Sequence, residues 1–97
     1  MSKIDILWFE DNILCKLAGY DINIRHFPKG DFGKLDQVSI ESNKIGCEVE
    51  FWGSGRISIF VWDYLKEKEL LNELLVTEND TQKKKSLTKT LDILLQS

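Results

Sequence analysis

The sequence of 97 residues offers few side chains whose types and spacing suit catalysis. His26 is its one histidine, and it lies in an alternating segment, where a structural or surface role is the usual one. Acid–base catalysis needs titratable groups positioned together in a cleft, and Asp31 in the following loop is the nearest candidate partner. We therefore expect no catalytic residue and no enzyme. A small enzymatic or ligand-binding domain built on His26 and Asp31 is the alternative hypothesis.

The two cysteines, Cys15 and Cys47, are far apart in the chain. Zinc sites usually draw on clustered Cys and His residues, so two distant cysteines and one histidine predict no metal site, and we expect no cofactor. Both cysteines stand among apolar neighbours, which predicts buried thiols. Two isolated cysteines are typical of a reduced, cytosolic protein.

Signals for export or membrane insertion are not evident. The first residues include Asp5, Glu10 and Asp11, and these charges interrupt any apolar stretch of a secretory signal. No run approaches the roughly 18 apolar residues that span a bilayer. We therefore expect a cytoplasmic protein without a membrane partner.

Two pairs of carboxylates, each near a tryptophan, have the chemistry of a protein-binding surface. Glu48 and Glu50 alternate on one side of a predicted strand beside Trp52, and Glu10 and Asp11 follow Trp8. Tryptophan is enriched among interface residues that carry binding energy, and carboxylates there would meet Lys or Arg of a partner. The predicted partner-binding residues are Glu48, Glu50, Trp52, Glu10, Asp11 and Trp8. A solvated outer face is the alternative for the glutamates, core packing is the alternative for Trp8, and Trp62 is expected in the core.

Charge is unevenly distributed along the chain. Residues 1–80 have a formal charge of −6, whereas residues 81–97 have +3 and include Lys83, Lys84 and Lys85. Nucleic-acid binding needs a broad basic face, which the acidic body lacks, and we expect the three lysines to be solvated on a frayed helical turn. The charge therefore favours a basic protein partner over direct contact with nucleic acid.

Hydrophobic periodicity predicts the elements that position these residues. Apolar spacing predicts a helix over 4–18 that ends at Gly19, and a loop follows over 28–34. Alternation predicts strands, with a turn at Asn43–Lys44 and a hairpin turn at 53–55. The predicted strands cover residues 20–27, 35–42, 45–52 and 56–64, of which the last is apolar on both faces and is expected to be covered on both.

Two C-terminal helices complete the prediction. Leucines at helical spacing predict helices over 65–76 and 82–96, the second capped by Asp80 or Thr81. Grouped strands and grouped helices favour an α+β fold, in which a small antiparallel sheet of about four strands is packed by the N-terminal helix and the C-terminal helices. We expect residues 1–97 to form a single domain.

A hairpin pattern within residues 45–75 carries a family resemblance. Its residues are Trp52, Gly53, Gly55, Ile57, Ile59, Trp62 and Asp63. They resemble the core hairpin of small immunity proteins that accompany bacterial polymorphic toxins, including those of contact-dependent growth inhibition. The resemblance covers about a third of the chain and assigns no binding residue.

The resemblance implies an antitoxin of the cytoplasm. Such a protein would bind a cognate toxin domain in a one-to-one complex and block its active site or substrate groove. Many of these toxins are nucleases with basic clefts, which an acidic binder would suit. A generic homodimeric module that pairs through a free sheet edge is a further alternative.

Overall fold

The computed structural model describes residues 4–28, 33–76 and 79–96. Five strands and two α-helices follow one another along the chain, with a short 3₁₀ helix, η1, after the first α-helix. Their bounds are Ile6–Asn12 for α1, Leu14–Lys16 for η1, Asp21–Phe27 for β1, Leu35–Glu41 for β2, Ile45–Trp52 for β3, Ile57–Asp63 for β4, Lys68–Leu75 for β5 and Asp80–Leu95 for α2.

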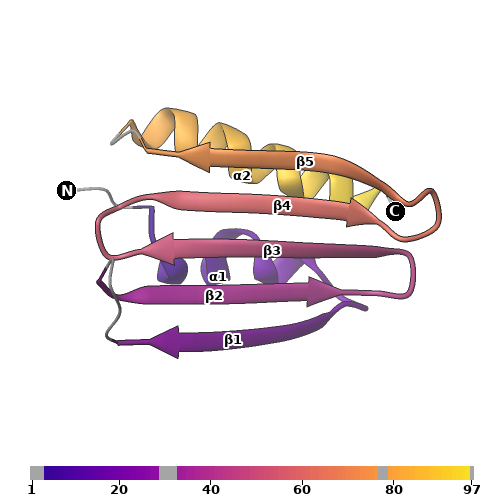
Figure 1. The fold of residues 1–97 in the computed structure, drawn as a ribbon, viewed down its shortest axis with the longest axis horizontal. Coiled ribbons are helices and arrows are strands. Elements are labelled where there is room, and N and C mark those ends of the chain that lie inside the picture. Colours follow the sequence, from indigo (N-terminus) through magenta and orange to yellow (C-terminus); the bar gives the residue numbers. More distant parts are fainter. Residues whose placement is uncertain (1–3, 29–32, 77–78, 97) are drawn as a thin grey trace.

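The strands form one antiparallel sheet in which each strand pairs with its neighbours in the chain, in the order β1-β2-β3-β4-β5. Both helices lie on the same side of this sheet, α1 behind its centre and α2 behind its β4–β5 side (Figure 1). The predicted α+β class with an antiparallel sheet is confirmed. The sheet has five strands instead of about four, and one C-terminal α-helix instead of two packs against it.

The core fills the space between the inner sheet face and the helices. Alternate residues of the three central strands are fully buried, as period-two patterning requires. The helices contribute residues at helical spacing, and the ring of Phe9 packs on that of Phe51 with 5.4 Å between centroids. Buried core residues include Phe9, Ile13, Val38, Ile40, Val49, Phe51, Ile59, Val61, Leu87, Leu91 and Leu94.

Side-chain caps begin both helices. The Asp5 carboxylate accepts a hydrogen bond from the Trp8 backbone N–H at 3.0 Å, which satisfies a donor that has no partner within α1. The Asn79 side chain accepts from the Gln82 N–H at 3.2 Å and caps α2 in the same way. The prediction of Asp80 or Thr81 as the cap was therefore one or two residues late.

The β3–β4 hairpin forms where the sequence predicts it. Gly55 closes the turn with a φ of 96°, a conformation that glycine adopts without steric cost, and its N–H donates to the Trp52 carbonyl at 2.9 Å. The turn at Asn43–Lys44 is also confirmed, with the Ser42 hydroxyl accepting from the N–H groups of Lys44 and Ile45. The two turns fix the register of the central strands.

The prediction of a helix over 65–76 was wrong, because Lys68–Leu75 is the edge strand β5. Without β5, the outer backbone groups of β4 would lack partners, and this tertiary demand outweighs the local helical spacing of the leucines. A register shift opposite Val61 and Trp62 lets adjacent Leu70 and Leu71 both contact the core. This register shift, a β-bulge, therefore allows a strand to contain two adjacent inward leucines, a pattern that is typical of a helix.

Lys83 corrects the expectation of a frayed, solvated first turn in α2. Its side chain is 0% exposed, and its ammonium donates to the Gly55 carbonyl at 2.7 Å. The contact joins the start of α2 to the β3–β4 turn, which is 28 residues away in sequence. Lys84 and Lys85 are exposed, as predicted.

Glu73 is unusual among the residues of β5. It lies opposite Ile59, whose side chain is in the core, and its Oε2 is buried without a hydrogen-bond partner among the described residues. An inward-directed carboxylate on an edge strand has a desolvation cost, which packing elsewhere must offset.

In the described part of the chain, neither helix has the length and apolar character needed to cross a membrane.

Truncation of Lys83 tests its contact with Gly55. We expect Lys83→Ala to lower the free energy of unfolding by about 2 kcal/mol, because it removes a charged hydrogen bond and buried methylenes. The matched variant Lys84→Ala changes an exposed position on the same turn and should alter stability by less than about 0.5 kcal/mol. Urea denaturation measures both, and equal losses would contradict the role assigned to Lys83.

Candidate functional site

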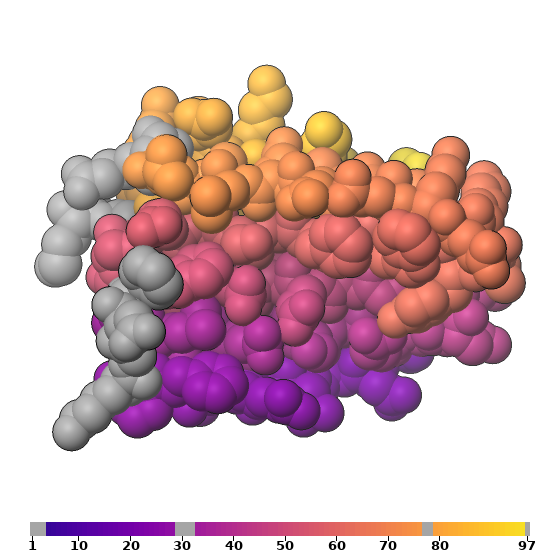
Figure 2. Space-filling model, viewed as in Figure 1, coloured from indigo at the N-terminus to yellow at the C-terminus, as the bar shows by residue number. Residues whose placement is uncertain are grey.

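No helix or strand of the described residues covers the sheet face opposite the helices, and Figure 2 shows this face in the same view as Figure 1. We call it the open face. The strand register and the alternation along each strand define its residues. They are Asp21, Asn23, Arg25, Phe27, Leu35, Gln37, Ser39, Glu41, Gly46, Glu48, Glu50, Trp52, Ser58, Phe60, Trp62, Glu69, Asn72 and Leu74.

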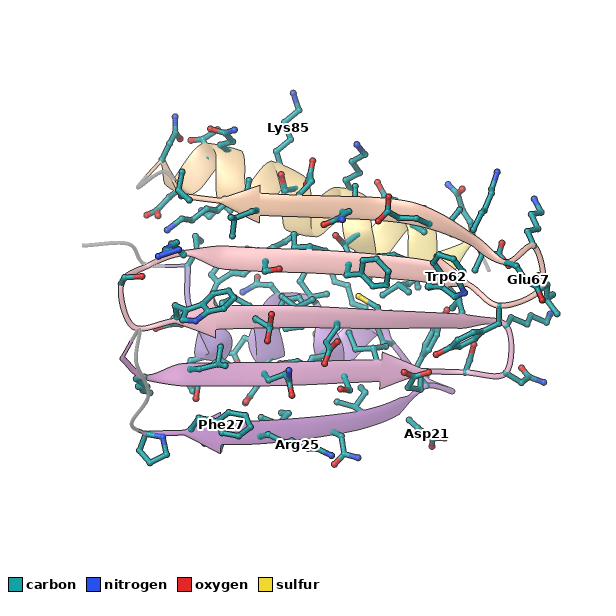
Figure 3. All side chains as sticks on the ribbon, viewed as in Figure 1. Asp21, Arg25, Phe27, Trp62, Glu67 and Lys85 are labelled. Atoms are coloured by element: carbon teal, nitrogen blue, oxygen red, sulfur yellow. The ribbon has the colours of Figure 1, made fainter. Side chains whose placement is uncertain are left out.

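Negative charge dominates the open face. It has one basic residue within the described strands, Arg25, which lies on the edge strand β1 (Figure 3). Its carboxylates come from four strands and lie in neighbouring cross-strand rows. They are Asp21, Glu41, Glu48, Glu50 and Glu69. Because like charges in adjacent rows repel one another, this face favours the approach of a cation.

Aromatic side chains lie among these carboxylates. Phe60 and Trp62 stack with 6.2 Å between ring centroids and 14° between ring planes, and Phe60 is 36% exposed. The prediction that Trp62 belongs to the core, on a covered face, was wrong, because both described helices lie on the other side of the sheet (Figure 1). Trp52 is half-buried and is the last residue of β3, whereas Gly46 lies at the start of that strand.

A hollow of about 160 Å³ lies within the open face and is lined by residues of β2, β3 and β4. Gly46 lies between Glu41 and Trp62 in the register, and a methyl group at this position would overlap the Tyr64 hydroxyl. The hydroxyl of Tyr64 donates to Glu41 Oε2 at 2.6 Å across the hollow's edge. This hydrogen bond, followed by smaller effects of desolvation and negative charge, raises the pKa of Tyr64 above 10.0.

The carboxylates of the open face differ in their partners. Glu50 accepts from the Gln37 amide at 3.0 Å, and Glu69 accepts from the Asn72 amide at 2.9 Å. Glu48 is exposed, and no side chain of the described residues forms a hydrogen bond or ion pair with its carboxylate. Glu48 therefore lines the hollow with a carboxylate that no described side chain binds.

The six predicted partner-binding residues do not form one surface. Glu48, Glu50 and Trp52 share the open face, as predicted from their alternation. Trp8, Glu10 and Asp11 belong to α1, in the layer on the other side of the sheet, where Trp8 is partly buried against the core. A partner that binds the open face would therefore contact Glu48, Glu50 and Trp52 but not the three residues of α1.

Sequence reasoning missed four residues that complete the open face around the hollow: Glu41, Gly46, Phe60 and Tyr64. Phe60 could have been found, because it alternates with Trp62. Glu41 and Tyr64 could not, since they are 23 positions apart and meet only in the folded sheet.

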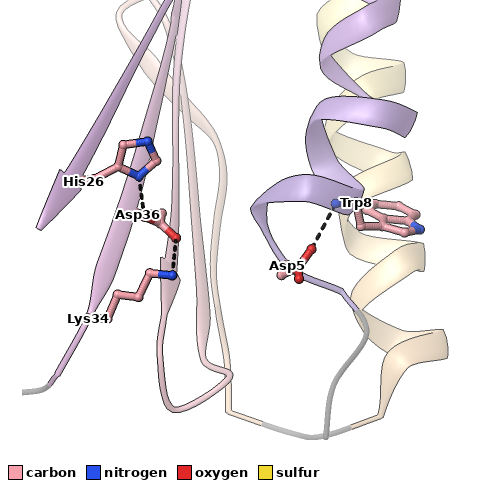
Figure 4. Close-up of polar contacts among 5 residues, drawn as sticks. All are labelled: Asp5, Trp8, His26, Lys34 and Asp36. Carbon is pink, nitrogen blue, oxygen red and sulfur yellow. Dashed lines mark hydrogen bonds and ion pairs between the residues drawn. The ribbon is translucent and has the colours of Figure 1, made fainter. Parts of the chain in front are cut away.

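His26 takes part in a contact between strands. Its Nδ1 lies 2.6 Å from Asp36 Oδ1, and Lys34 Nζ lies 3.8 Å from Asp36 Oδ2 (Figure 4). His26 and Asp36 are opposite one another in the β1–β2 register, so their contact holds the edge strand to its neighbour. Asp31, which the alternative hypothesis pairs with His26, lies outside the described residues. Within the described ranges, no three His, Cys, Asp or Glu side chains gather to hold a metal ion.

The two cysteines have different environments. Cys47 is buried as predicted, and burial, with the nearby charges of Glu48 and Glu41, raises the pKa of its thiol to about 12. Cys15 is exposed, so the prediction of a buried thiol was wrong there, because its side chain falls beside the apolar arc of the N-terminal helical segment.

Thiol labelling distinguishes the cysteines. At pH 8 we expect iodoacetamide to modify Cys15 quickly, while Cys47 stays protected by burial and by a negligible thiolate fraction. Mass spectrometry of peptides from the folded protein measures both sites, and unfolding in urea should make both reactive. Equal labelling of the two thiols in the folded protein would contradict this assignment.

Substitution of Glu41 tests the hydrogen bond at the hollow. We expect Glu41→Gln to lower the pKa of Tyr64 toward its ordinary value, because the charged acceptor is lost. Since the folded pKa is raised, the stabilisation from this contact is present below about pH 10 and declines as pH rises through the raised pKa. NMR titration of the Tyr64 ring signals measures the change. The control variant Glu50→Gln removes an equal charge from the neighbouring strand β3 and should lower the pKa of Tyr64 less. An equal lowering by both variants would contradict the hydrogen bond between Glu41 and Tyr64.

Comparison with known proteins identifies no relative: no family model, curated protein or solved structure matches the chain.

Proposed function

We propose that this protein is an immunity protein that binds a cognate toxin domain and blocks its active site or substrate groove. The observation that carries the proposal is the open face, which combines five carboxylates and one arginine with the stacked rings of Phe60 and Trp62. The partner of matching chemistry is a basic protein surface. A nuclease domain has such a surface, because its substrate cleft must attract phosphates.

The charge of the open face favours fast and selective association. An acidic surface attracts a basic cleft over roughly a Debye length, and such steering raises association rates by about tenfold to a thousandfold. Carboxylates seated in the cleft would occupy the positions of substrate phosphates. Neutralisation then needs no chemical step, only a complex that forms quickly and dissociates slowly.

The aromatic residues and Leu74 on the open face supply the apolar part of the contact with the toxin domain. Phe60 is 36% exposed, and Leu74 on β5 is 58% exposed. Trp52 and Trp62 are half-buried, so their rings are already held by neighbours before a partner binds. Anchors that are ordered in advance lose little conformational freedom on association, which favours affinity.

The resemblance in the central hairpin adds to this proposal. Its residues fall on β3, the turn and β4, the strands at the centre of the open face. An antitoxin of this kind would act in the cytoplasm, in a one-to-one complex, and would not itself contact nucleic acid or a membrane.

Charge reversal on each side of the sheet tests which surface binds. The partner to use is a toxin domain encoded beside this protein's gene, studied by stopped-flow fluorescence. We expect Glu48→Lys with Glu50→Lys to slow association by about tenfold or more at low salt, because steering is reversed. The difference from wild type should shrink as salt is added.

The matched control is Glu10→Lys with Asp11→Lys on α1. It changes the net charge by the same amount on the opposite layer, so it should leave association within about twofold of wild type. Equal slowing by both pairs would show that only the overall charge matters, and no slowing by the first pair would exclude the open face as the interface.

Co-expression tests the function itself. The wild-type chain should restore growth of cells that express the toxin domain, and light scattering of the purified mixture should give the mass of a one-to-one complex. Failure to protect cells, although the protein is folded and abundant, would refute the proposal.

A further inference from the structure

The hollow at Gly46 has the chemistry of a pocket for one long cationic side chain. Its volume is about 160 Å³. Gly46 lines the hollow, and the Tyr64 hydroxyl lies over it, so a side chain at this position would meet Tyr64. The walls come from Phe60, Trp62 and Tyr64 and from the carboxylates of Glu41 and Glu48.

Resting on the proposed function, we propose that this hollow is the subsite that receives an arginine side chain of the basic partner. The stacked rings of Phe60 and Trp62 offer an aromatic surface, and a cation within about 6 Å of such a ring is attracted to its face. The Glu48 carboxylate provides the opposite charge and has no side-chain partner of its own among the described residues.

The geometry favours arginine over lysine. A guanidinium is planar, so it stacks on an aromatic ring while its N–H groups form two parallel hydrogen bonds with a carboxylate. It is also less strongly hydrated than an ammonium group and loses less on leaving water. The Tyr64 hydroxyl already donates to Glu41 Oε2, so Glu41 holds the Tyr64 side of the hollow in place. Glu48 is then the carboxylate that accepts the guanidinium hydrogen bonds.

The hollow spans the middle strands of the sheet and lies at the end of those strands that faces the Asn43–Lys44 turn. Glu48 belongs to β3, the middle strand of five, and Trp62 lies near the end of the neighbouring β4 (Figure 3). Asp21 and Glu69 share the cross-strand row of Gly46 but belong to the two edge strands, outside the lining of the hollow.

The test needs no partner protein, because a single amino acid can probe the pocket. N-acetyl-arginine amide is titrated into the folded chain and followed by NMR. We expect concentration-dependent shifts of the Gly46 amide and the Trp62 indole N–H, and none at the Trp8 indole in the other layer. N-acetyl-lysine amide should bind several-fold more weakly, and uncharged N-acetyl-norleucine amide should cause no shift at these signals.

Variants assign the site to its residues. Glu48→Gln removes the charge with little change of shape and should weaken binding of the arginine probe by about tenfold. Gly46→Ala puts a methyl group against the Tyr64 hydroxyl, which displaces this wall of the hollow and should abolish binding. Trp62→Leu should weaken binding independently of charge. Glu69→Gln is the matched control, because it removes an equal charge from the open face outside the hollow, and it should bind as wild type does. The amide spectrum of each variant reports whether it is folded.

Two results would overturn the subsite: no shift at Gly46 and Trp62 with the arginine probe, or equal weakening by Glu48→Gln and Glu69→Gln. If the probe fails while charge reversal at Glu48 and Glu50 still slows the toxin domain, the subsite is refuted and the proposed function stands. If the probe binds but the toxin domain is not neutralised, the hollow is an arginine site and the proposed function falls.

Discussion

Burial of the inner sheet face against α1 and α2 is the interaction on which the other features depend. The five strands are joined in sequence by short connections, so both helices come from the ends of the chain and pack on one side of the sheet. Most inner positions of the central strands, such as Val49 and Ile59, are therefore apolar and buried. The outer positions are free to carry carboxylates and aromatic rings, because burial does not determine them.

Much of the fold could be predicted from local patterns. Alternation in 35–42 and 45–52, with Gly53 and Gly55 between β3 and β4, identified the central hairpins, and apolar spacing identified α2. The helix predicted over 4–18 is shorter in the structure, because α1 ends at Asn12 and the 3₁₀ helix η1 follows it. β5 could not be predicted this way, because Leu70, Leu71, Leu74 and Leu75 have the spacing of a helix. Residues 68–75 form a strand because they pair with the free edge of β4 and because the bulge opposite Val61 fits the adjacent leucines. Both features exist only in the assembled sheet.

The candidate site was predictable to the same extent. Glu48, Glu50 and Trp52 lie on one strand, so their common face follows from alternation alone. The hollow depends on Glu41, Gly46 and Tyr64, which register brings together across strands. The apolar outer side of β4 was misleading, since Phe60 and Trp62 resemble core residues in sequence but lie on the surface. Likewise, Lys83 resembles a surface lysine, and only its carbonyl partner at Gly55 explains its burial.

The buried Oε2 of Glu73, which has no hydrogen-bond partner among the described residues, has a consequence for how this protein meets extended polypeptides. A sheet that ends in open strands can recruit further strands and aggregate, and a charge aimed inward on a terminal strand is one of the defences that proteins use. On β5 that charge, together with the bulge near Leu70, disfavours continuation of the hydrogen-bond ladder. These two features disfavour strand addition at β5, so β1 is the edge of the sheet that lacks this protection.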